Sequence, residues 1–132
     1  MKPSTAKPLF SANLLLRLLP AVGWMLLVAW LSLQSNPPTI EVSFVSWDKF
    51  QHAAAYGLLC LLTGWGLLPL FRRPFAPWLT AGALTIAIGG LLELAQATFT
   101  AVRAPEWGDL LADAVGAALV VAAAWWRGRG AR

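Results

Sequence analysis

Charged residues are scarce in this 132-residue sequence, and cysteine and histidine each occur only once. The single cysteine, Cys60, excludes an internal disulfide. No metal-ligand motif such as His-Glu-x-x-His and no glycine-rich phosphate loop is present. Charged residues make up 12% of the chain and hydrophobic residues 58%. This composition is typical of an integral membrane protein.

Four apolar stretches divide the chain, roughly Leu14–Leu33, Phe50–Leu70, Ala76–Ala97 and Leu110–Trp126. Each is close to the ~20 residues that a helix needs to cross a bilayer. Backbone groups in lipid must satisfy their own hydrogen bonds, so these stretches are expected to be helices. The sequence predicts an all-α, polytopic membrane protein with four transmembrane helices in a compact bundle.

The predicted domain organisation is simple. We expect a cytoplasmic tail over residues 1–13, one transmembrane domain over 14–127 and a basic cytoplasmic tail over 128–132. A cleaved secretory signal is the less favoured interpretation of the first span. Its apolar run exceeds a normal signal core, and Ser32-Leu33-Gln34-Ser35-Asn36 is a poor cleavage site.

The charges are sorted between the two sets of span ends. All cations except Lys49 and Arg103 lie at one set, and all acids lie at or near the other. Positively charged loops stay in the cytoplasm. This predicts a bacterial cytoplasmic (inner) membrane protein with both termini inside. Topology also accounts for the net charge of +4, so no nucleic-acid partner is expected.

Three polar rows begin at the span ends where the acids gather. Residues four apart share a helix face, as do residues three apart. The rows are Asp48–His52–Tyr56 with Lys49 beside it, Glu93–Gln96, and Asp109–Asp113. Ionisable groups inside a membrane are costly and therefore need a partner or a purpose. We expect the rows to converge on a polar cavity that opens outward.

The ordered set of these residues resembles the VanZ-like membrane proteins. The resemblance covers about residues 32–120 and rests on Asp48-Lys49-x-x-His52-x-x-x-Tyr56, Glu93-x-x-Gln96, Arg103 and Asp109-x-x-x-Asp113-x-x-Gly116. Many members of that family carry Asn at the position of Asp113. The resemblance implies a relation to teicoplanin-resistance proteins, hence an expected link to the cell envelope and to antibiotic resistance.

The leading hypothesis is recognition, and chemical modification, of an envelope lipid or lipid-linked molecule. His52 and Glu93 are the candidate catalytic residues, because imidazole and carboxylate groups transfer protons near neutral pH. Lys49 and Arg103 would bind an anionic head group. The remaining candidate ligand-binding residues are Asp48, Tyr56, Gln96, Asp109 and Asp113.

Three alternatives stay open. The polar residues of a non-enzymatic scaffold or accessory subunit could form a structural network, in which Asp48 caps its helix and Glu93 pairs with Lys49, Arg103 or His52. A proton-coupled transporter fits less well, because the inner half lacks matching polar residues. A metal site of His52, Glu93 and Asp113 is chemically conceivable, but the sequence favours neither a metal nor a cofactor.

Overall fold

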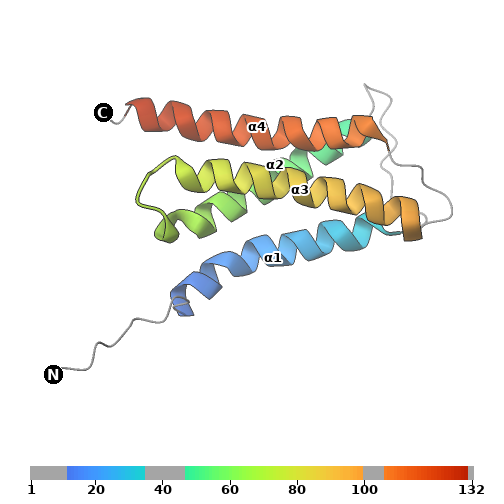
Figure 1. The fold of residues 1–132 in the computed structure, drawn as a ribbon, viewed down its shortest axis with the longest axis horizontal. Coiled ribbons are helices and arrows are strands. Elements are labelled where there is room, and N and C mark those ends of the chain that lie inside the picture. Colours follow the sequence, from blue (N-terminus) through green and yellow to red (C-terminus); the bar gives the residue numbers. More distant parts are fainter. Residues whose placement is uncertain (1–11, 35–46, 100–105, 131–132) are drawn as a thin grey trace.

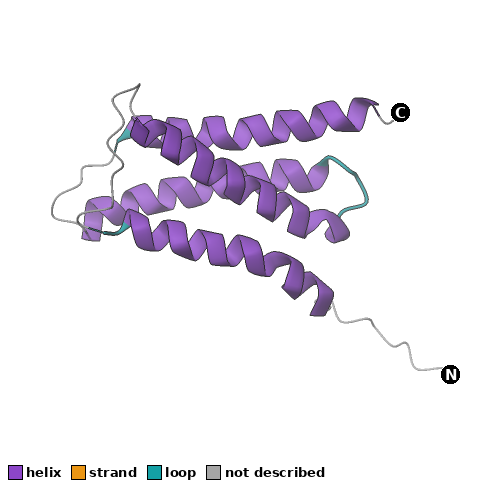
Figure 2. Cartoon of the chain, turned by 180° about the vertical axis from the view of Figure 1, so that it is seen from behind, coloured by secondary structure: helices purple, strands orange, loops and turns teal. Residues whose placement is uncertain are grey.

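The computed structural model describes residues 12–34, 47–99 and 106–130. Within these ranges all regular structure is helical (Figures 1 and 2). The helices are α1 (Ala12–Ser32), α2 (Trp47–Leu67), the short 3-10 helix η1 (Leu68–Leu70), α3 (Ala76–Phe99) and α4 (Trp107–Gly130). The four α-helices are each long and apolar enough to cross a membrane. They pack together, which confirms the predicted polytopic bundle.

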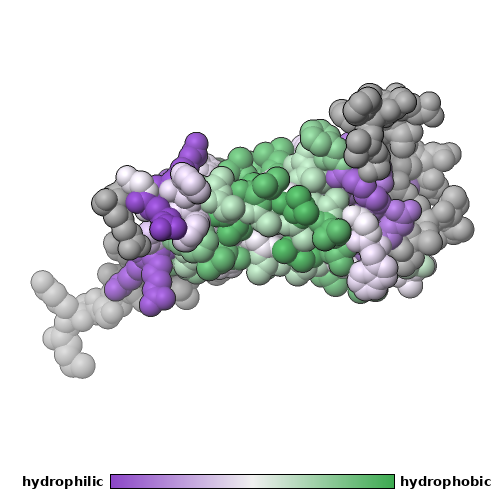
Figure 3. Space-filling view, turned by 90° about the horizontal axis from the view of Figure 1, so that it is seen from above, coloured by the Kyte–Doolittle hydropathy of each residue, from purple (hydrophilic) through white to green (hydrophobic). Residues whose placement is uncertain are grey.

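Successive helices run in opposite directions, so the bundle has two chemically different ends (Figure 1). We call the end where α2 and α4 begin the acidic end, because Asp48 and Asp109 lie in their first turns. The opposite end, which holds Arg127 and Arg129 in the last turn of α4, is the basic end. Figure 3 shows a hydrophobic band between hydrophilic side chains at the two ends. This is the pattern that a bilayer selects.

The bundle interior is built from small and medium side chains. Cys60, Ala81 and Ala117 form one buried cluster, and Tyr56 belongs to another. Many large apolar side chains lie on the outside instead, such as Leu94 with 65% exposure. Such exposure would be costly in water but places apolar side chains against acyl chains in lipid.

Small residues allow α2 and α4 to approach very closely. A side chain added at Gly116 would collide with the backbone of Ala53. One added at Gly57 would lie 3.3 Å from the Gly116 carbonyl oxygen. The four-residue spacing of Ala53 and Gly57, and of Ala112 and Gly116, predicts close packing, and this contact confirms it.

Two side chains from different helices tie α1 to the rest. The Trp24 indole Nε1 donates a hydrogen bond to the Ala55 carbonyl oxygen at 2.9 Å. Gln96 Nε2 donates to the carbonyl oxygen of Ser32 at 2.9 Å. These bonds fix α1 along α2 and against the end of α3. Pro20 lies inside α1, so it does not start this helix.

Gly116→Ala is expected to lower the thermal unfolding temperature in detergent. The added methyl group would force α2 and α4 apart, and overpacking of this kind costs about 1–3 kcal/mol. Gly23→Ala is the control, because no described atom lies within 4 Å of a Cβ at that position. Similar unfolding temperatures for both variants would contradict the close contact.

Candidate functional site

Lys49 is the centre of an ion-pair cluster at the acidic end. Its Nζ atom lies 2.6 Å from Glu106 Oε2, and it also bonds Asp109 Oδ1. Asp48 Oδ2 is 3.7 Å away on the same helix. Lys49 therefore links the first turn of α2 to the first turn of α4 and the residue before it.

His52 lies one turn deeper in α2 and contacts two acids of α4. Its Nδ1 is 2.9 Å from Asp113 Oδ1, and its Nε2 is 3.8 Å from Asp109 Oδ2. An ionised carboxylate only accepts hydrogen bonds, so with Asp113 ionised Nδ1 is the donor in the shorter contact. The ring also stacks on Tyr56, with centroids 6.1 Å apart. His52 is thus held in one orientation between its own helix and α4.

Asp113 is the deepest acid of the cluster, with no solvent-exposed surface. Its Oδ2 atom has no hydrogen-bond partner among the described residues. A Cβ at Gly89 of α3 would lie 2.6 Å from this oxygen and 3.1 Å from the Tyr56 ring. Only glycine leaves room for the Asp113 carboxylate and the Tyr56 ring at this position. The backbone of α3 therefore lies directly against the innermost part of the site.

Glu93, one turn beyond Gly89, reaches the other side of the site. It is 9% exposed, and its Oε2 accepts a hydrogen bond from the backbone N–H of Glu106 at 3.2 Å. Glu106 directly precedes α4, where free amide groups need acceptors. Glu93 therefore fixes the start of α4 against α3. The sequence could not reveal this role, because it depends on where α4 begins in space.

The remaining predicted site residues have mixed positions. Tyr56 is buried in the cluster with Val28 and Leu59, and only its stacking contact joins it to His52. Gln96 is buried and bonds to α1. Arg103 lies outside the described residues. Glu106 is not among the predicted site residues, yet it bonds Lys49. Its place three residues before Asp109 was the signal for this contact.

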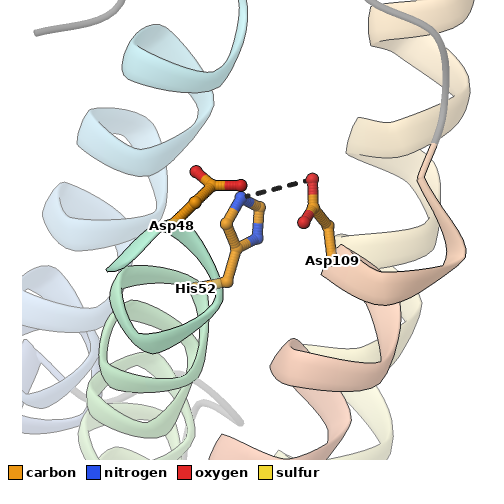
Figure 4. Close-up of side chains that lie close together, drawn as sticks. All are labelled: Asp48, His52 and Asp109. Atoms are coloured by element: carbon orange, nitrogen blue, oxygen red, sulfur yellow. Dashed lines mark ion pairs between the residues drawn. The ribbon is translucent and has the colours of Figure 1, made fainter. Parts of the chain in front are cut away.

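Side-chain exposure decreases from the first turn of α2 toward the interior of the bundle. Side-chain exposure is 51% for Asp48 and 30% for Lys49, then 14% for His52 and zero for Asp113. One donor atom each from Asp48, His52 and Asp109 lies within 4.8 Å of the other two. Figure 4 shows the Asp109 carboxylate facing the imidazole from α4, with Asp48 on the same helix as His52. These three side chains are the described group with metal-ligating geometry.

The comparisons with protein-family models, curated proteins and solved structures found no match. The resemblance to VanZ-like proteins is therefore a prediction that rests on the residues alone. The fold and the polar cluster define the chain as a four-helix membrane protein with ionisable groups from α2, α3 and α4 gathered at one end.

Gly89→Ala is expected to destabilise the protein, whereas the neighbouring Gly90→Ala is not. The first change drives a methyl group against Asp113 and Tyr56, at a cost of about 1–3 kcal/mol. The second meets its nearest atom, in Leu110, at 4.0 Å and gains helix propensity. Thermal unfolding in detergent measures both. A Gly90→Ala variant as unstable as Gly89→Ala would show that the carboxylate is not the cause.

Proposed function

We propose that the chain is a VanZ-like protein of the bacterial cytoplasmic (inner) membrane that recognises the polar head of an envelope lipid or lipid-linked molecule. The observation that carries the proposal is the convergence of Lys49, His52, Asp109 and Asp113 from two apolar helices. Ionisable side chains inside membrane helices usually mark a binding or proton-transfer site. The decrease in side-chain exposure with depth suits a head group that enters from the membrane–water interface.

The proposed orientation places the acidic end outside the cell and both termini inside. It is supported by the arginines at the basic end, Arg72, Arg73, Arg127 and Arg129. Cytoplasmic loops carry an excess of Lys and Arg. In this orientation the ion-pair cluster lies at the outer leaflet, where envelope lipids and lipid-linked precursors present their head groups.

The orientation can be tested by cysteine labelling in intact cells. Cys60 is fully buried, so the native chain gives little background. Ser43→Cys should react with a membrane-impermeant maleimide, because position 43 lies between α1 and α2, on the side that the proposed orientation places outside. Gly128→Cys, at the basic end, should react only after the membrane is permeabilised. The reverse pattern would overturn the proposed orientation.

The charge balance of the cluster indicates the kind of head group. Lys49 is already bonded to Glu106 and Asp109, so a phosphate would have to displace a carboxylate to reach it. Among the described side chains of this cluster, acids outnumber bases. Of the acids around Lys49, Glu106 has the most exposed side chain and Asp48 the next most exposed. We therefore propose a head group rich in hydrogen-bond donors, such as an amine or a sugar.

Apolar side chains beside the cluster suit the rest of an amphiphile. Phe50 follows Lys49 directly and is 61% exposed, and Trp107 follows Glu106 and is 86% exposed. Tryptophan rings favour the membrane–water interface. An acyl chain could lie against them while its head group enters the cluster. Within such a complex the His52–Asp113 pair supplies a general acid or base, and Glu93 positions the start of α4.

A scaffold or accessory subunit is the second candidate, and the density of the ion-pair network favours it. Lys49 joins α2 to α4, and His52 joins them again one turn deeper. A buried pair that loses one partner destabilises a protein by about 3–5 kcal/mol. Under this candidate the polar residues serve only to lock the helices together.

Lipid binding and stability together separate the two candidates. Phosphatidylethanolamine, which carries an amine, should bind more tightly than phosphatidylglycerol to the detergent-purified protein in EDTA, as followed by native mass spectrometry. Asp48→Asn should weaken that binding at least about tenfold, because a hydrogen bond to a charged group is lost. Arg72→Gln, at the basic end, is the control and should bind as the native chain does.

His52→Ala and Glu93→Gln extend the test to the deeper residues. Recognition predicts that the folded variants bind less lipid and change envelope-lipid turnover in cells. The scaffold candidate predicts lower unfolding temperatures with no effect of added lipid. Well-folded variants with native binding and turnover would overturn the recognition proposal.

A further inference from the structure

We propose that Asp48, His52 and Asp109 bind a divalent transition-metal ion at the acidic end, through one carboxylate oxygen from each acid and the imidazole Nε2. This site differs from the one that sequence spacing suggested, because its acids come from the first turns of α2 and α4. Glu93 and Asp113 are not ligands in it. The inference does not rest on lipid recognition.

The spacing of the donor atoms fits one ion. The three lie within 4.8 Å of one another, and Nε2 is 3.8 Å from Asp109 Oδ2. Ligand bonds of about 2.1 Å place neighbouring donor atoms roughly 3–4 Å apart. The Nε2–Oδ2 distance is too long for a hydrogen bond but suits two ligands of the same ion.

The position of His52 points the same way. Its Nδ1 lies 2.9 Å from Asp113 Oδ1, so a ring that donates its N–H there presents Nε2 to a metal ion. Metal-binding histidines almost always donate their other ring N–H to a carboxylate or carbonyl. Here Nε2 faces the Asp109 carboxylate across 3.8 Å (Figure 4).

The neighbouring charges favour a cation despite the presence of Lys49. That ammonium group bonds Asp109 Oδ1 and Glu106 Oε2, which leaves Asp109 Oδ2 directed at His52. Asp113 adds a buried carboxylate behind the ring, with its Oδ2 unpartnered among the described residues. The carboxylates of Asp48, Glu106, Asp109 and Asp113 thus outnumber the single ammonium group beside them.

The ligand types select the class of ion. One imidazole and two carboxylates suit Zn²⁺, Mn²⁺ or Fe²⁺, whereas Mg²⁺ and Ca²⁺ prefer oxygen ligands alone. Asp48 is half exposed, with a side-chain exposure of 51%. The outer coordination positions would therefore remain open to water or to an incoming oxygen ligand. A closed structural zinc site would have four protein ligands instead.

Zinc titration of the full-length protein tests the proposal. The protein is purified in lipid-free detergent with a tag that contains no histidine, so that His52 is the only imidazole present. We expect saturable uptake of one Zn²⁺ per chain, measured by equilibrium dialysis with elemental analysis. Asp48→Asn, which changes the most exposed ligand and spares the helix contacts, should weaken binding more than tenfold, and Asp109→Asn should do the same.

Glu106→Gln is the matched control, because it removes an equal charge from the same cluster without removing a proposed ligand. Its zinc affinity should stay within about threefold of native, as expected for an exposed charge. The ¹⁵N NMR signal of His52 Nε2 should shift when Zn²⁺ is added, while Nδ1 keeps its proton. Absence of saturable uptake, equal weakening by Glu106→Gln, or a doubly protonated ring that ignores Zn²⁺ would each overturn the proposal. Lipid binding measured in EDTA is unaffected by any of these results.

Discussion

The close contact of α2 and α4 is the constraint on which the polar site depends. Ala53 follows His52 directly, and its backbone lies against Gly116. Asp113 is three residues before Gly116 and so occupies the same helix face. Where the two backbones touch, His52 beside the contact and Asp113 about one turn before it are brought within hydrogen-bond distance. A larger residue in the contact would therefore separate the imidazole from its carboxylate as well as the two helices.

The same contacts serve stability and chemistry, which limits how the site can vary. Charges withdrawn from water lose solvation that their partners only partly restore. Lys49 with Asp109, and His52 with Asp113, are such pairs between α2 and α4. Removal of Lys49 or His52 leaves the acids around it with less compensation for their lost solvation. Isosteric changes, such as Asp to Asn, therefore reveal more about function than truncations to alanine.

Local sequence patterns predicted the helices well. Apolar length placed four spans whose ends lie within a few residues of those of the observed helices. Helical periodicity also placed Asp48 and His52 on one face, and Asp109 and Asp113 on another. Both signals arise within a single helix, so no knowledge of neighbouring helices is needed to read them.

Partners between helices were less predictable, because periodicity does not set how far one helix slides along another. Lys49 meets Glu106 and Asp109, and Glu93 meets a backbone amide. The proposed metal-ligating group contains Asp48 and Asp109 in place of Glu93 and Asp113. Each of these contacts depends on how α2, α3 and α4 are shifted relative to one another along the bundle axis. Contacts at glycines set this shift, and the sequence does not show which residue each glycine meets.

The attachment of α1 uses a different chemistry, with consequences for how this helix can change over evolution. Both of its described hydrogen bonds to other helices end on main-chain carbonyl oxygens, at Ala55 and at Ser32. Every amino acid supplies that oxygen, so replacements at these two positions keep the acceptor. Only the donors, Trp24 and Gln96, need particular side chains. Substitutions are therefore tolerated at the acceptor residue of each bond and are costly at the donor residue.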